Sequence, residues 1–438
     1  MQRNPHRLPG EAFSALARGG GGAAAVRHLR AAERSRHLLL ILGVVDTARQ
    51  AGHPHAGVAA GAYDALAALE RRAPTAVDRL IRHPAVGAWA RHTVSALLGR
   101  QDGAHDPAGL GAVAAAAAVV AGVPYEGDVP VTDGRVVLPS LGALAVPAPD
   151  GLVRLRTDGH GRVAAAGREA AAGEGLESAG WQGLHRLTAE AGGQRLSVLL
   201  DDLDPYRWPA RTATPVRMAD GERRALAGHL RDAWRVLVTG HWTIAQEAAA
   251  VVAVLTPILG PEHGQNSASS ADLFGTVALS RPPDGLWLAG TLAHEIQHAK
   301  LSALLSVTEL VLPDDGRRFY APWREDPRPA HGLLQGAYAY LGVTGFWRRQ
   351  RSLLPPGDDR FRAEVEFARW RESAHHVTGT LAASGRLTQA GETFVAAMRG
   401  TLEPWLKEPA SRAATAAARH QSELHRRRWT KAHGHPAA

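Results

Sequence analysis

A change in the hydrophobic pattern along the chain constrains the fold more than any other feature. Up to about Gly122, and again from about Ala219, apolar residues recur at the three- and four-residue spacing of helices. Between these stretches, residues 123–203 show short apolar runs separated by glycine turns, such as the two runs that flank Asp133-Gly134. The sequence therefore predicts an α+β fold that is predominantly helical and contains a small antiparallel β subdomain.

Composition excludes several classes of protein. The chain has no cysteine, which excludes disulfides, thiolate metal sites and cysteine nucleophiles. The longest dense apolar run, Leu38–Val45, is far shorter than the roughly 18–20 residues of a membrane helix. The first residues lead into no apolar segment, so we expect no signal peptide and a cytoplasmic protein. The net charge of +8 favours a solvated basic surface, with an acidic or peptide partner as the alternative, and we expect neither a membrane nor a nucleic-acid partner.

One motif carries recognisable chemistry. The segment His294-Glu295-Ile296-Gln297-His298 lies inside a long predicted helix, residues 286–311. Histidines four residues apart share one helix face, so both imidazoles can bind one divalent metal ion. Glu295 is turned by roughly 100° from His294 because a helix has about 3.6 residues per turn. It is therefore poorly placed as a third ligand, but it can reach a metal-bound water or a substrate. The alternative is a pair of surface histidines that binds no metal.

A third protein ligand is expected downstream, where two prolines precede a new helix that starts near His331. His331 has the best intrinsic chemistry, since imidazole suits zinc and iron. Glu325 or Asp326 would complete a set of two histidines and one carboxylate, although each is also explained as a helix N-terminal charge or an arginine partner. Gln335 lies on the face of His331 but offers only a weak amide ligand. The sequence alone does not choose among these four.

Five segments in and around the motif are distinctive: Leu273–Ser280, Leu292–Leu301, Tyr320–Arg324, Asp326–Pro329 and Gly332–Ala339. They resemble one known family, the HExxH-motif peptide-modification proteins, with weaker similarity at Leu8–Phe13 and Leu38–Leu40. This family is associated with ribosomally synthesised and post-translationally modified peptides, and a similar domain accompanies cyclophane-forming radical-SAM maturases. The resemblance covers most of the chain and is most specific over residues 274–347.

The resemblance implies an Fe(II)/2-oxoglutarate-dependent hydroxylase that installs a β-hydroxyl on a side chain of a precursor peptide. It implies that His294 and His298 bind the iron, that Glu295 is the acid of the motif, and that Gln335 is a metal ligand or lies near the metal. We expect Arg328 to bind the far carboxylate of 2-oxoglutarate, because a guanidinium suits a carboxylate. The partners implied are a precursor peptide and a radical-SAM maturase of the same pathway.

Two other functions remain open. The motif alone favours a zinc metallopeptidase, in which Glu295 acts as general base toward a zinc-bound water. Alternatively, a non-catalytic protein could present a precursor peptide to another maturase. For the hydroxylase, we expect the peptide to lie beside the strand-like segment Phe274–Leu279, by strand addition.

Four regions are expected along the 438 residues, a length typical of two or three domains. They are a helical N-terminal region (1–122), the small antiparallel β subdomain (123–205), a catalytic core with the HExxH motif (206–408) and a frayed basic C-terminal tail (409–438). Within them, the alanine- and valine-rich run 112–121 is expected to be a buried helix. The apolar stretch 244–259 is expected to be a single helix, and the metal helix is expected under an edge strand, as in zincin-like folds.

Overall fold

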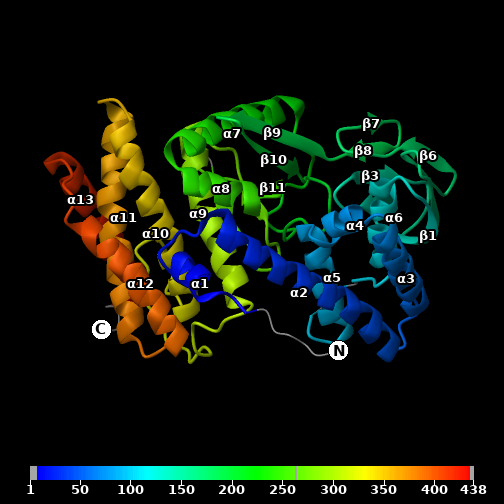
Figure 1. Ribbon diagram of the computed structural model, residues 1–438, viewed down its shortest axis with the longest axis horizontal. Helices are drawn as coiled ribbons and strands as arrows, with labels where there is room; N and C mark the ends of the chain where they lie inside the picture. Colours follow the sequence, from blue (N-terminus) through cyan, green and yellow to red (C-terminus); the bar gives the residue numbers. More distant parts are fainter. Residues whose placement is uncertain (1–6, 102, 104, 262–263, 435–438) are drawn as a thin grey trace.

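The computed structural model describes residues 7–101, 103, 105–261 and 264–434 (Figure 1). The N-terminal region is helical, as predicted, and Pro74 and Pro84 each occupy the first position of a helix, where the missing N–H has no partner to lose. The alanine-rich run is a helix, and most of it is buried because its small side chains allow close packing. The helices are α1 (Gly10–Ala17), α2 (Gly22–Gln50), α3 (Ala56–Arg72), α4 (Pro74–Ile81), α5 (Pro84–Leu97) and α6 (Gly109–Ala121).

Eight strands follow in two antiparallel sheets, with orders β1-β4-β5-β6 and β2-β3-β8-β7. Asp133 and Gly134 both have positive φ, 51° and 67°, and they form the predicted two-residue turn. The strands it joins then diverge, since β1 pairs with β4 and β2 with β3, so the expected hairpin is a single bridge. The strands are β1 (Pro124–Val131), β2 (Arg135–Leu138), β3 (Gly142–Ala145), β4 (Gly151–Asp158), β5 (Arg162–Ala165), β6 (Arg168–Ala171), β7 (Glu177–Ser178) and β8 (Trp181–Gly183).

The third sheet has five strands in the order β12-β13-β11-β10-β9. Its three middle strands are parallel, and both edge strands are antiparallel to their neighbours. The sheet draws β9 and β10 out of the region expected to form the small β subdomain, because Leu199 and Leu200 pair with Val254 and Leu255. Its strands are β9 (His185–Ala191), β10 (Gln194–Leu200), β11 (Val254–Pro257), β12 (Ser267–Ala268) and β13 (Thr276–Leu279).

Two expectations for this sheet are wrong. The stretch 244–259 is not one helix, because α8 (Trp242–Val251) ends before the strand β11. Short apolar runs rich in β-branched residues are ambiguous between helix and strand, and here the parallel pairing decides. In addition, β13 pairs with β11 on one side and β12 on the other. No edge is therefore free beside Phe274–Leu279, and the edge strands of the sheet are β12 and β9.

The remaining helices are α7 (Asp220–Gly240), which precedes α8, and α9 (Gly285–Leu305), α10 (Ala330–Leu353), α11 (Asp358–Ala383), α12 (Gln389–Leu406) and α13 (Arg412–His433). The metal-motif helix α9 starts at Asp284, whose side chain accepts a 2.7 Å hydrogen bond from the Trp287 N–H, and it ends before the predicted residue 311. The C-terminal tail is not frayed, because α13 packs along α11 and buries Trp429; residues 435–438 lie outside the described part.

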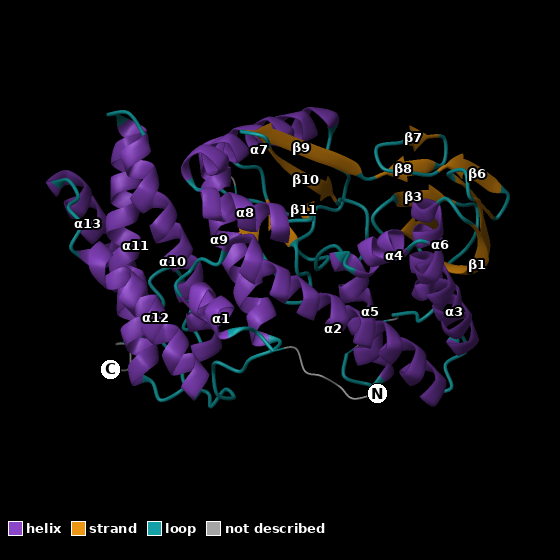
Figure 2. Cartoon of the chain, in the orientation of Figure 1, coloured by secondary structure: helices purple, strands orange, loops and turns teal. Residues whose placement is uncertain are grey.

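The elements form three groups along the long axis of the molecule (Figure 2). The helices α10 to α13 form one end, the five-stranded sheet with α7, α8 and α9 lies in the middle, and α3 to α6 with β1 to β8 form the other end. The long helix α2 runs from the middle to that end. The mainly helical α+β class is therefore confirmed. Across the described residues, no helix has both the length and the apolar composition to cross a bilayer.

Candidate metal centre

The two motif histidines converge on one point beside α9, as their spacing predicts. Nε2 of His294 lies 3.2 Å from Nε2 of His298, and the ring planes meet at 70°. Two imidazole nitrogens bound at about 2.1 Å to one ion, with roughly 100° between them, would be this far apart. The pair therefore fits two neighbouring positions around a divalent metal ion.

Burial keeps His294 in the form that binds metals. Both histidines are half-buried. Burial lowers the pKa of His294 to about 4, against the opposing charge of Glu295 and with a smaller contribution from His298 in the same direction. A neutral imidazole has a lone pair to give to a metal ion. His294 can thus act as a ligand near neutral pH without first losing a proton.

Gln335 contacts the other nitrogen of His298. Its Oε1 lies 3.0 Å from Nδ1 of His298, and its Nε2 donates to Oγ of Ser302 at 3.2 Å. The second contact fixes the amide orientation, so Nδ1–H donates to Gln335 and Nε2 keeps its lone pair. In this arrangement Gln335 orients His298, which is the near-metal role, and its role as a metal ligand stays a prediction.

Glu295 is almost completely buried, with 1% of its surface exposed. Its Oε1 accepts a 2.7 Å hydrogen bond from Oγ of Ser267 on β12, while Oε2 is buried and has no hydrogen-bond partner among the described residues. One turn earlier on α9, Thr291 donates to Oε1 of Gln265 at 2.9 Å. These two contacts hold β12 against the metal-motif helix, and they leave Glu295 one oxygen that can take or give a proton.

An aromatic wall closes one side of the histidine pair. The Tyr340 ring meets His294 edge-on at 5.3 Å, and Trp323 and Trp370 contact the other parts of Tyr340 at centroid distances of 4.7 and 4.2 Å. Gly336, one turn before Tyr340, is required here because a Cβ would overlap the Trp323 indole. Such a wall limits the access of water to the pair.

Ser267 and Tyr340 could not be identified from the sequence. Nothing in a serine-rich connection marks one serine as the partner of a distant glutamate. For Tyr340 a weak signal was present, since Gly336 and Tyr340 share one face of the helix that carries Gln335.

The other predicted residues lie in and after the loop before α10. Asp326 accepts hydrogen bonds from Arg324 and Arg328 at 2.8 and 2.9 Å, which agrees with the simpler interpretation of this carboxylate. Arg328 lies over Gly332, with its Nε 3.1 Å from the position of a Cβ there. His331 is exposed in the first turn of α10, and Glu325 lies in an open hollow with His433.

Among the described residues, no third histidine or carboxylate lies close enough to the His294–His298 pair to bind the same ion. The one group of three or more such side chains close enough for a single ion is instead His53, His55 and Asp106. Nδ1 of His55 lies 2.9 and 2.8 Å from the two oxygens of Asp106, and Asp106 also accepts the Ala108 N–H at 2.8 Å. This second group has ligand chemistry and also ties the α2–α3 turn to the start of α6.

No protein-family model matches the chain, and no curated protein matches it significantly.

Proposed function

We propose that the protein is an Fe(II)/2-oxoglutarate-dependent hydroxylase that adds a β-hydroxyl to a side chain of a ribosomally synthesised peptide. The observation that carries the proposal is the pair of Nε2 atoms 3.2 Å apart, with His298 oriented through Nδ1 by Gln335. Two histidines in neighbouring positions suit an iron centre that must also accept a bidentate cosubstrate. Iron bound there would supply the oxidising power for an unactivated C–H bond. The resemblance of residues 274–347 to peptide-modification proteins supports the same activity.

Each neighbouring residue has a role in this proposal. Arg328 binds the far carboxylate of 2-oxoglutarate, since it lies over Gly332, about one turn before the Gln335 that touches His298. Glu295, fixed by Ser267, places a carboxylate oxygen next to the reacting groups. The Tyr340 wall excludes water, which protects a reactive centre from side reactions.

The peptide binds along β12 in this proposal. This strand is one of the two edge strands of the sheet, and its Ser267 contacts the glutamate of the motif. An extended peptide paired with such an edge gains main-chain hydrogen bonds and passes its side chains in front of the histidines. A metal helix beside an edge strand is also the arrangement expected of a zincin-like core.

A zinc metallopeptidase is the second candidate, and one observation favours it. Oε2 of Glu295 is buried, has no partner among the described residues and lies one residue from His294, which suits a general base that takes a proton from water. The two activities differ in their products, because one cleaves the peptide and the other adds an oxygen atom to it.

Anaerobic titration distinguishes the two without a substrate. Apo-protein is titrated with Fe(II) and then with 2-oxoglutarate while a visible charge-transfer band is followed. A saturable band that is absent in His298→Ala is the expected result. Stoichiometric zinc binding with no band in the iron and 2-oxoglutarate sample would favour the peptidase.

A further inference from the structure

A cavity of about 460 Å³ is lined in part by residues 270–273, which closely follow β12 in the chain. It is enclosed by α5, α6, the β1–β2 region and two loops, residues 204–210 and 270–273. Its walls are mainly apolar and aromatic, with Trp89, Trp208 and Leu273 as the largest buried contributors. Walls of this kind with a few converging polar groups are typical of binding sites.

Among the carboxylates of the cavity, Asp204 is the one without an ion pair in the described residues. Asp272 pairs with Arg91 at 2.5 Å, and Asp106 pairs with His55. Asp204 accepts the Tyr206 N–H at 2.8 Å, and the nearby Arg207 donates to the backbone oxygen of Asp204 rather than to its carboxylate. The cavity thus presents an acidic group that a cation can neutralise.

The cation in the lining is Arg135, and besides the carboxylates the other titratable groups there are Tyr206, His92 and His105. Burial lowers the pKa of both histidines, so they are neutral near pH 7. Burial, and then the neighbouring Asp201, raise the pKa of Asp204 to about 7. An isolated carboxylate is therefore costly here, and a bound cation would relieve that cost.

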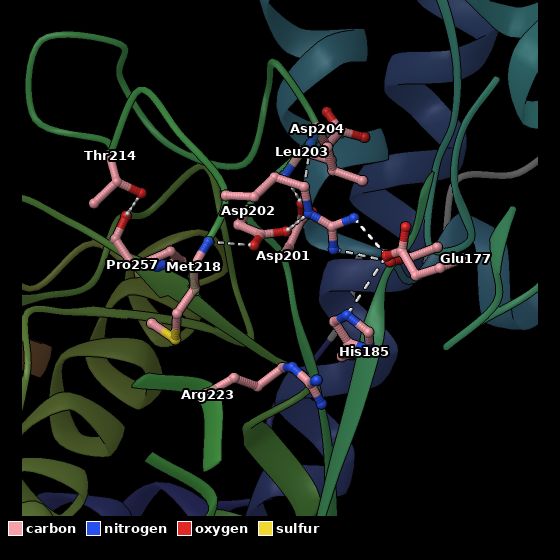
Figure 3. A network of polar contacts seen from close by, with 12 residues as sticks. Glu177, His185, Asp201, Asp202, Leu203, Asp204, Thr214, Met218, Arg223 and Pro257 are labelled. Atoms are coloured by element: carbon pink, nitrogen blue, oxygen red, sulfur yellow. Dashed lines mark hydrogen bonds and ion pairs between the residues drawn. The ribbon is translucent and has the colours of Figure 1, made fainter. Parts of the chain in front are cut away.

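A polar network holds the Asp204 loop in place (Figure 3). Oδ1 of Asp201 accepts the N–H groups of Leu203 and Asp204 at 3.1 and 2.9 Å. Asp202 accepts the Met218 N–H at 2.9 Å and Nε of Arg217 at 3.2 Å. Because these contacts order the loop before any ligand arrives, Asp204 would lose little conformational freedom on binding one.

The cavity is close to the metal centre along the chain. Ser267 donates to Glu295 of the motif, and Ser270 already lines the cavity. Three residues of extended chain span at most about 10 Å. A peptide that leaves the histidine pair along β12 therefore reaches the cavity within a few residues.

We infer that this cavity is a recognition subsite for a basic side chain, arginine or lysine, of the peptide substrate. The cation pairs with Asp204, and the aliphatic stem packs against Trp208 and Trp89. Given the spacing above, the basic residue stands about three to six residues from the residue that is modified. The inference rests on the proposed function, because it takes the peptide along β12.

The first test uses two isosteric probes on the full chain. N-acetyl-arginine methylamide carries the cation, and N-acetyl-citrulline methylamide is its neutral counterpart. We expect arginine to bind the wild-type protein at least about tenfold more tightly by calorimetry, because a charged hydrogen bond replaces a neutral one. In Asp204→Asn this preference should vanish, whereas Asp232→Asn, an exposed acid on α7, should keep it.

A second variant keeps the test decisive if Asp204→Asn folds poorly. Ala210 is exposed and lines the cavity, so Ala210→Trp fills it without disturbing the core. Both probes should then bind more weakly. Equal binding of the two probes to the wild type, or unchanged binding to Ala210→Trp, would overturn the subsite.

The distance is tested with a bivalent probe. Arginine is joined through glycine spacers of increasing length to a hydroxamate, which chelates zinc, and binding to zinc-loaded protein is measured. Affinity should pass through a maximum at a spacer of about three to six residues. A flat profile on metal-loaded protein would contradict the placement. If hydroxamate adds nothing and zinc does not bind, the metal centre fails, while a retained arginine preference still supports the cavity.

Discussion

At the scale of single residues, the site depends on how the two histidines are held. The His294–His298 spacing is legible in the sequence because a helix fixes it, and the structure brings the two Nε2 atoms together. The role of Gln335 could not be predicted in the same way. An amide can bind a metal or orient a ligand, and only the position of His298 Nδ1 distinguishes the two.

Replacing Gln335 tests this orienting role. Gln335→Leu removes the acceptor for Nδ1–H, so the ring loses its fixed tautomer and orientation. Affinity for Fe(II) or Co(II), measured by chelator competition, should fall by about 10- to 100-fold. Gln335→Glu keeps an acceptor at this position and should retain most of the affinity. Wild-type affinity in Gln335→Leu would show that the contact is incidental.

Buried histidines should make the fold sensitive to acid. Burial lowers the pKa of His37 to about 4, and its Nδ1 lies 2.7 Å from the Ile81 carbonyl oxygen. Because the unfolded state takes up the proton near pH 6.5 and the folded state does not, stability is lost as pH falls from about 6.5 to 4. The loss from His37 should approach roughly 3 kcal/mol. Urea unfolding at several pH values measures it, and His37→Gln should flatten the profile.

At the scale of elements, α9 is anchored on its other face by the N-terminal part of the chain. Nζ of Lys300 lies 2.8 Å from Oε2 of Glu247 and donates to the carbonyl oxygens of Gly19 and Gly20 at 3.2 and 3.3 Å. Gln297 donates to the Gly19 oxygen at 2.8 Å. The sequence of Gly19–Gly22 itself gives no sign of these contacts. The partners of this glycine segment lie in α8 and α9, and no local sequence pattern predicts contacts between residues so far apart in the chain.

Breaking this ion pair should be costly. Lys300→Met leaves the carboxylate of Glu247 buried without a cation, which typically destabilises a protein by about 3–5 kcal/mol. Adding Glu247→Leu removes the stranded charge and should recover much of that loss. Urea unfolding of the two variants and the wild type gives the comparison. Equal stability of the single and double variants would argue against a coupled pair.

At the scale of the whole molecule, the α+β class and the predominance of helix could be predicted, because periodicity reports burial on one face. The membership of sheets could not. Leu196, Val198 and Leu200 look the same whether their strand ends a small antiparallel unit or joins β11. Pairing with a strand far away in the chain decides between the two sheets, and no local sequence pattern encodes that pairing. For the same reason the basic C-terminal helix was expected to fray, although Trp429 is buried against Tyr320 with ring centroids 5.2 Å apart.

Removing the contact between Trp429 and Tyr320 should loosen the loop of residues 319–326, which lies far from Trp429 in the sequence. The helix α13 contacts the loop of residues 319–326. Trp323 in this loop stacks on Tyr340, the tyrosine beside His294. Trp429→Ala should weaken this packing by about 3 kcal/mol. Hydrogen exchange of the amides in residues 319–326 should then accelerate, whereas Arg427→Ala, an exposed change on the same helix, should leave it unchanged. No acceleration would mean that the loop is held independently of α13.

The contact between Gln297 and the Gly19 carbonyl can form only late in synthesis of the chain, because 278 residues separate its two partners. At about 5–20 residues per second, a ribosome needs roughly 14 to 56 s to make the intervening chain. Throughout that interval α1 and the start of α2 lack their final packing partner, and their apolar faces stay exposed to the crowded cell. Newly made chains should therefore depend on chaperones that shield the first helices until the metal-motif helix has left the ribosome.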